Sequence, residues 1–125
     1  MNTLYNILGD DLKIVLESCE DIKFLDDTEI EDRINFLKNV DCSIQQIKNI
    51  IIYNPWFLIR SLIDLNKLKD KLISIGITNL NITFDTNPLI LNKEVFEIDD
   101  FINNKIKEGL NTYDIIDLID GGIEW

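Results

Sequence analysis

Carboxylates are the side chains in this chain that could take part in chemistry, because histidine, the commonest acid–base catalyst and metal ligand, is absent. Two acidic runs stand out, at residues 26–32 and 97–100. Their members are Asp26, Asp27, Glu29, Glu31, Asp32, Glu97, Asp99 and Asp100. The first run has the length of a calcium-binding loop but lacks its central glycine and places Ile30 where an oxygen ligand is needed. It is open to two interpretations: a cation or acid–base site, or acids that stabilise helix N-termini and form a solvated face.

The remaining reactive groups do not form a catalytic pattern. Cys19 and Cys42 lack the CxxC spacing of metal and redox sites, and there is no histidine to activate a nucleophile. None of the five glycines belongs to a phosphate-binding loop with a following lysine. The sequence therefore predicts no enzyme, no metal and no cofactor, and it predicts that both cysteines are buried thiols of a reducing, cytoplasmic environment.

Basic residues gather in the middle of the chain, although the whole chain has a formal charge of −11. Residues 43–81 have a net charge of +3, whereas the segments on either side have −7 each. Arg60, Lys67 and Lys71 are spaced to lie on one side of a helix, and Lys48 belongs to the helix before it. Such a stripe could neutralise phosphates, which supply most non-specific affinity for nucleic acid. The alternative is an ordinary solvated helix face, partly neutralised by nearby aspartates.

A repeated pattern predicts the elements that position these groups. Asn54-Pro55 returns 33 residues later as Asn87-Pro88, and the apolar positions around both pairs coincide under the same shift. Each unit should contain a helix ended by Asn-Pro, a short apolar 3₁₀ turn, a second helix and a closing glycine, Gly76 or Gly109. A fixed period of this length is typical of stacked repeats that bury their apolar faces against one another.

The fold class predicted from this period is all-α: stacked helix-turn-helix repeats of about 33 residues that form a short solenoid of three to four units. The chain is short enough for a single domain, since domains span ~100–200 residues. Its predicted parts are a degenerate N-terminal unit (1–41), two regular units (42–76 and 77–109) and a truncated last unit (110–125).

Four details of this scheme are specific enough to be checked. A shift of 32 residues relates the first unit to the second and places Phe24-Leu25 on Trp56-Phe57, which should both be buried. The third helix should be capped by Asp27 or by Thr28, the latter with Glu31 in a capping box. Asn79–Phe84 alternates like a strand, yet the register of the repeat requires a helix there.

The predicted unit resembles the repeat of the mitochondrial transcription termination factor family. The residues that carry the resemblance are Asn54, Pro55, Leu58, Leu62, Leu65, Leu72, Gly76, Asn87, Pro88, Leu91 and Gly109. The resemblance covers roughly residues 42–120. It implies a curved stack with nucleic acid along one face, which in this chain would be contacted through Lys48, Arg60, Lys67 and Lys71.

The charge distribution favours a protein partner over nucleic acid, because acidic flanks repel a long polyanion. We expect a non-enzymatic module that binds a protein with a basic surface, for example as an inhibitor or immunity-type protein. The candidate partner contacts are Asp26, Asp27, Glu31, Asp99, Asp100 and Trp125. Trp125 could instead dock on the last unit, and self-association through that unit is a further alternative. No signal peptide and no apolar run of membrane-spanning length is found, so no membrane contact is expected.

Overall fold

The computed structural model describes residues 2–121, and every regular element in that range is helical, which confirms the predicted all-α class. The α-helices are α1 (Asn2–Leu8), α2 (Leu12–Ser18), α3 (Asp27–Asn39), α4 (Ile44–Tyr53), α5 (Leu62–Ser74), α6 (Leu80–Thr86), α7 (Val95–Lys107) and α8 (Thr112–Asp120). The 3₁₀ helices between them are η1 (Gly9–Asp11), η2 (Glu20–Phe24), η3 (Pro55–Ile59) and η4 (Pro88–Asn92).

Side-chain caps determine where the helices of the middle and the end of the chain begin. The Ser43 hydroxyl accepts the backbone N–H of Gln46, whose side-chain oxygen accepts the N–H of Ser43, so α4 starts with a capping box. Ser61 caps α5 and Asn111 caps α8 in the same manner, each by accepting the N–H three residues on. These three caps were predicted from the sequence and are confirmed.

The cap of α3 was predicted wrongly. Asp26, rather than Asp27 or Thr28, occupies the N-cap, and its carboxylate accepts the backbone N–H of Glu29 at 2.8 Å. The backbone of Asp26 is extended, whereas Asp27 and Thr28 are already helical. A cap must lie outside the helix to reach the N–H groups of its first turn, so the helix begins one to two residues earlier than predicted.

Helix α6 forms against the local preference of its sequence. Asparagine and threonine are poor helix formers, and the segment alternates like a strand. Leu80, Thr83 and Phe84 are nevertheless all buried, and the Phe84 ring lies 6.1 Å from that of Phe36 on α3. Packing of one apolar face outweighs intrinsic propensity here, so the helix expected from the repeat register at Asn79–Phe84 is confirmed, with bounds Leu80–Thr86.

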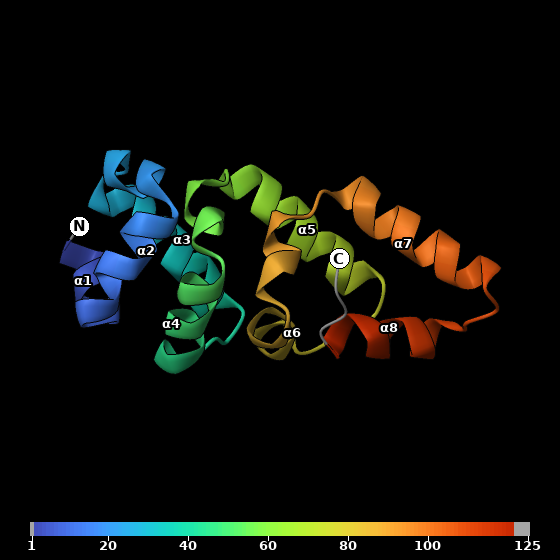
Figure 1. Ribbon diagram of the computed structural model, residues 1–125. Coiled ribbons are helices and arrows are strands. Elements are labelled where there is room, and N and C mark those ends of the chain that lie inside the picture. The colour runs from blue at the N-terminus through green and yellow to red at the C-terminus, as the bar shows by residue number, and fades with distance from the viewer. Residues whose placement is uncertain (1, 122–125) are drawn as a thin grey trace.

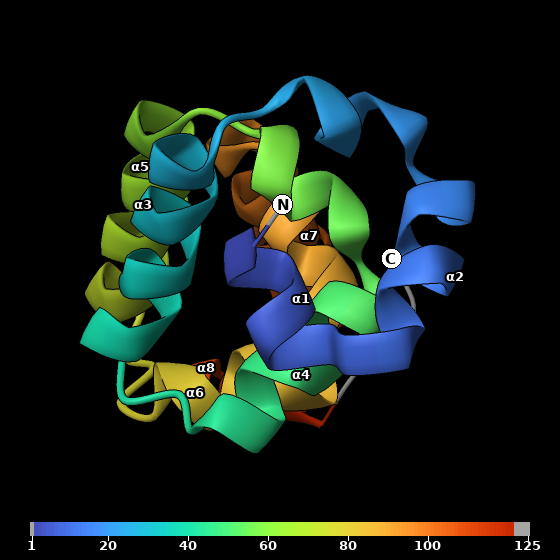
Figure 2. The same cartoon turned by 90° about the vertical axis from the view of Figure 1, so that its left-hand side faces the viewer.

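The helices are arranged in rows along the molecule. Contacts link α2 to α4, α4 to α6, and α6 to α8, and a second row runs from α3 through α5 to α7. The 3₁₀ helices η2, η3 and η4 follow one another in a third row. Figure 1 shows the rows running from the N-terminal end to α7 and α8, and Figure 2 looks along them from the N-terminal end.

The three helix–3₁₀–helix segments share backbone geometry at their joints. The residue before each 3₁₀ helix has nearly the same φ and ψ: −142° and 87° at Cys19, −143° and 72° at Asn54, −132° and 70° at Asn87. The residue that ends each second helix has positive φ, 69° at Asp41, 108° at Gly76 and 93° at Gly109. Aspartate tolerates this conformation better than most residues with a side chain, and glycine adopts it freely.

These joints correct the predicted register of the first segment. Cys19 precedes Asn54 by 35 residues, and Asn54 precedes Asn87 by 33. The shift of 32 residues is therefore wrong, and Ile22 rather than Leu25 corresponds to Phe57. Ile22 and Phe57 are both completely buried, whereas Phe24 is 79% exposed. The first segment lacks the Asn-Pro pair that marks the register in the other two, which explains the error.

One continuous core runs through the described part of the chain, and one predicted member of it lies outside. Phe57, Leu58, Ile90 and Leu91 are completely buried in η3 and η4. Trp56 was also expected in the core but is 43% exposed. A 3₁₀ turn repeats every three residues, so adjacent apolar side chains cannot all point the same way.

Two asparagines occupy equivalent places but have different partners. Asn54 is completely buried and donates from Nδ2 to the carbonyl oxygen of Pro88 at 2.8 Å, which ties η3 to η4. Asn87 is also buried, at 6% exposure, but its Nδ2 has no hydrogen-bond partner among the described residues. The same residue type therefore makes an interhelical bond at one joint and none at the next.

We predict that Asn54→Ala destabilises the protein more than Asn87→Ala does. The first substitution leaves the Pro88 carbonyl without its donor, which costs about 1–3 kcal/mol, whereas the second removes an amide group that donates to nothing. Both asparagines precede a proline, so each is the control for the other. Urea unfolding of the two variants measures the difference. Equal losses of unfolding free energy would contradict the prediction.

Candidate functional site

The four candidate basic residues do not form one continuous stripe. Arg60 precedes the N-cap Ser61 and so lies before α5, not on it, which corrects the predicted placement. Lys67 and Lys71 are on α5, and Lys48 is on α4, in the other row. The partners of these side chains show in which direction each points.

Arg60 is part of the joint between two segments. Its Nη1 donates to the carbonyl oxygen of Leu91 at 2.6 Å, and its Nη2 lies 3.3 Å from Oε1 of Glu94. Its own carbonyl oxygen accepts Nε of Arg33 from α3 at 3.1 Å. The Arg60 side chain is only 11% exposed. This guanidinium group is thus enclosed by protein acceptors and has little surface left for a phosphate.

Lys48 and Lys71 are paired with carboxylates from opposite directions. Nζ of Lys48 lies 3.4 Å from Oδ2 of Asp11 in η1, at the N-terminal end. Nζ of Lys71 forms an ion pair with Oδ1 of Asp99 in α7, towards the C-terminal end. Lys67 is exposed and forms no ion pair with any described residue. One of the four predicted cations is therefore left with its charge facing solvent.

The acidic candidates lie at two separated places. Asp26, Asp27 and Glu31 are at the start of α3, beside α1, where Glu31 accepts the hydroxyl of Thr3 at 3.2 Å. Asp99 and Asp100 are on α7 at the far end of the rows (Figure 1). Asp26 is used as a cap and Asp99 as the partner of Lys71, which leaves Asp100 exposed. Trp125 lies outside the described residues.

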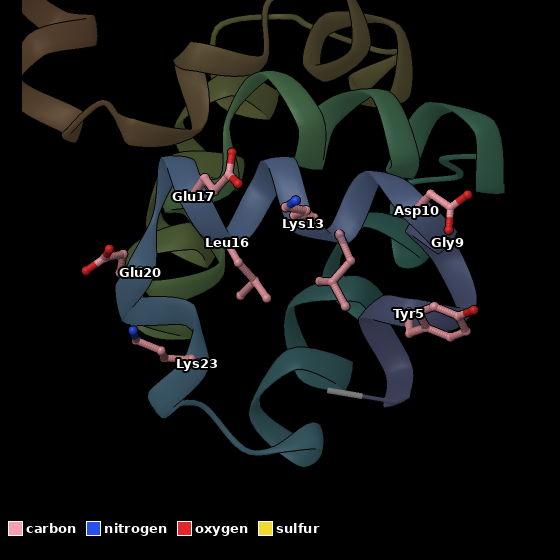
Figure 3. Close-up of a pocket in the computed structure, with 9 residues that line it drawn as sticks. Tyr5, Gly9, Asp10, Lys13, Leu16, Glu17, Glu20 and Lys23 are labelled. Atoms are coloured by element: carbon pink, nitrogen blue, oxygen red, sulfur yellow. The ribbon is translucent and has the colours of Figure 1, made fainter.

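A groove at the N-terminal end is the largest hollow described on the molecule, and the sequence did not predict it. Its volume is about 720 Å³, and it lies between α1, α2 and η2. The lining residues are Tyr5, Gly9, Asp10, Leu12, Lys13, Leu16, Glu17, Glu20 and Lys23. In Figure 3, Leu16 points into the groove, whereas the carboxylates of Asp10, Glu17 and Glu20 lie around its rim.

The corrected register explains why the floor of this groove is apolar. A shift of 35 residues places Leu12 and Leu16 on Ile47 and Ile51 of α4, which are completely buried. Leu12 and Leu16 themselves are only half-buried. Helix α4 lies between α2 and α6 in its row, whereas the far side of α2 has only the short α1 beside it. The signal was present in the sequence but was obscured by the wrong shift.

The two cysteines are buried thiols, as predicted. Burial, and then the nearby charges of Asp85 and Asp41, raises the pKa of Cys42 to about 12. Burial is also the main cause that raises the pKa of Cys19. A thiol with a raised pKa stays protonated near neutral pH, and the thiolate is the nucleophilic form. Neither cysteine has the environment of a catalytic nucleophile.

Two other kinds of site were searched for within residues 2–121. No cluster of three or more carboxylate or thiol side chains in that range is placed to hold a metal ion. None of the helices described there combines the length and the hydropathy that a membrane crossing needs. The functional surfaces left to consider are the groove and the exposed charges.

We predict that Arg60→Met lowers the free energy of unfolding by about 1–3 kcal/mol, because the Leu91 carbonyl then loses a charged donor in a largely buried place. The same substitution at Lys67, which is exposed, should change stability by less than about 0.5 kcal/mol. Chemical unfolding of Arg60→Met and Lys67→Met gives both values. If the two variants were equally stable, Arg60 would not have the structural role assigned to it.

Comparisons with known proteins found no match. No family model, no curated protein and no solved structure is similar enough to this chain to be identified as a relative. The resemblance to transcription termination factors therefore depends on the spacing of Asn54-Pro55 and Asn87-Pro88 and the apolar residues around them. Function has to be argued from the charges, contacts and hollows of this chain itself.

Proposed function

We propose that this chain is a non-enzymatic binding module whose partner is a protein with a basic surface. The observation that carries the proposal is the pairing of the central cations. Arg60, Lys48 and Lys71 each have a carboxylate partner in a neighbouring element, so the only region of positive net charge is largely neutralised within the molecule. The surplus of carboxylates, 23 against 12 basic residues, then determines which partners are attracted.

The proposed scaffold is a short solenoid of helix–3₁₀–helix repeats. Matching backbone angles at three joints support it, and so do the rows in which α4 and α6 each have a neighbour of their own kind on both sides. In such a stack each repeat contacts only its neighbours, and the terminal repeats need atypical outer faces. The proposed units are those predicted from the sequence, with the first joined to the second at a spacing of 35 residues.

Nucleic-acid binding, which the resemblance to transcription termination factors implies, is the competing hypothesis. It would depend on Lys67 and the unpaired lysines near it, together with Lys48 and Lys71 after release from their aspartates. An exposed ion pair is worth about 0–1 kcal/mol, so phosphates could compete for these two lysines. Arg60 is a weaker candidate because its guanidinium is nearly enclosed. Flanking segments of −7 each would repel the rest of a long polyanion.

Affinity capture from a lysate of the source cells tests the two hypotheses together. We expect the tagged protein to retain, at low salt, a protein of positive net charge in near-equal amount, and to release it as salt is raised. Treating the lysate with nuclease beforehand should leave this capture unchanged. Duplex DNA and single-stranded RNA, labelled for anisotropy, should not bind even at low salt.

Two outcomes would contradict the proposal. Capture that disappears after nuclease treatment, with steep salt-dependent binding of the labelled nucleic acids, would favour the competing hypothesis. Failure to capture any protein at any salt concentration would remove the basis for a basic partner. The variant Lys67→Met/Lys71→Met is the control, because its loss of nucleic-acid binding would identify α5 as the path.

A further inference from the structure

We propose that the groove between α1, α2 and η2 is the docking site for an amphipathic helix with a basic rim, contributed by the partner protein. This inference rests on the proposed function and specifies its site. The groove has an apolar floor, a rim that carries carboxylates, and a position at the end of a row of helices. Each of these three features limits what can occupy it.

The shape and the position of the groove call for a helix. Helices α4 and α6 each have helices on both sides in their row, and the residues equivalent to Leu12 and Leu16 are buried there. At α2 the corresponding place is occupied only in part, by the seven residues of α1. A helix laid along α2 would bury Leu12, Leu16 and the ring of Tyr5, which is 58% exposed. Such helix-in-groove recognition uses apolar anchors at helical spacing.

The charge around the groove calls for a basic occupant. Residues 2–24, which form its walls, have five carboxylates and two lysines. None of the three carboxylates at the rim, Asp10, Glu17 and Glu20, forms an ion pair with a described residue. Lysine or arginine residues beside the apolar face of an incoming helix would therefore meet unpaired carboxylates.

Charge also argues against a second copy of this chain as the occupant. The end of the row that would have to enter the groove of another copy is α8. That helix has Asp114, Asp117 and Asp120 and no basic residue. Placing it beside Glu17 and Glu20 would bring like charges together, which weakens the association. A basic helix from another protein satisfies both the apolar floor and the acidic rim.

The test uses a fluorescein-labelled peptide of leucine and lysine, about 18 residues or five helical turns long, with leucines on one face. Two control peptides keep the composition or the spacing: one with the leucine spacing scrambled, and one with glutamate in place of lysine. Anisotropy titrations at low salt give the dissociation constants. We expect the lysine–leucine helix to bind and both control peptides to bind at least about tenfold more weakly.

Matched variants locate the binding. Leu16→Lys should weaken the lysine–leucine helix about tenfold, because it places a charge in the apolar floor. Ile14→Lys is the same kind of change on the same helix at a side chain that is 57% exposed and outside the groove, and it should alter the affinity by less than about twofold. Far-UV circular dichroism checks that both variants are folded.

A second pair keeps the test valid if Leu16→Lys fails to fold. Glu17→Gln/Glu20→Gln removes two rim charges and should weaken binding about fivefold, whereas Asp32→Asn/Asp100→Asn removes two exposed charges elsewhere and should have little effect. Equal effects of the groove and control variants would overturn the docking site while leaving capture of a basic protein, and hence the proposed function, intact.

Two further results would overturn the inference. Absence of binding by the wild-type protein would exclude a basic amphipathic helix as the occupant, and the proposed function would then be judged by the capture experiment alone. Concentration-dependent sedimentation of the protein alone that Leu16→Lys abolishes would make a second copy the occupant. Sedimentation as a monomer, together with peptide binding that is lost in the groove variants, is the result we expect.

Discussion

Satisfying backbone carbonyls at the buried joints is the constraint on which this structure depends. A helix that ends at Asn-Pro and continues as a 3₁₀ turn leaves carbonyl oxygens without helical donors, and burying them unpaired is costly. Asn54 supplies a donor to the Pro88 carbonyl and Arg60 supplies one to the Leu91 carbonyl. Arg33 does the same for the carbonyl of Arg60. Each donor comes from the segment before the turn that it serves, so these bonds join successive segments as well as closing each turn.

This constraint accounts for the use of the central basic residues. An arginine at the end of η3 reaches both a carbonyl and a carboxylate of the next segment, which a lysine or a neutral residue could not do with the same geometry. Lys71 and Lys48 pair outward from the middle of the chain to acids on either side. The alternation of acidic, basic and acidic segments in the sequence therefore corresponds, at least in part, to contacts between neighbouring segments and need not reflect a surface for an outside polyanion.

Much of the fold could be predicted from local signals. The caps Ser43, Ser61 and Asn111, the glycines that close α5 and α7, and the helix at Leu80–Thr86 all follow from spacing and turn chemistry. The cap of α3, the exposure of Trp56 and the placement of the first segment could not be predicted so well. Cys19 and Asp41 take the joint positions that asparagine and glycine mark elsewhere, so only the backbone geometry shows the equivalence.

The candidate site was less predictable than the fold, because burial and pairing depend on contacts between distant residues. Nothing in the spacing of Lys48, Arg60 and Lys71 indicates that Asp11, Glu94 and Asp99 lie beside them. The groove was missed for a related reason. Leu12 and Leu16 look like ordinary core residues of an amphipathic helix, and only the arrangement of the rows shows that their neighbour is a short helix. Pattern identified which residues are apolar but not which of them lack a complete partner.

The central claim is that partner recognition takes place at the N-terminal groove and that the central cations serve the scaffold. The most direct measurement is a map of amide chemical shifts during titration with the lysine–leucine helix, and separately with duplex DNA. We expect the peptide to shift amides lining the groove, between Tyr5 and Lys23, and the DNA to shift none. Shifts centred on Lys67 and Lys71, with either ligand, would contradict the account, because they would show that α5 is the surface that partners contact.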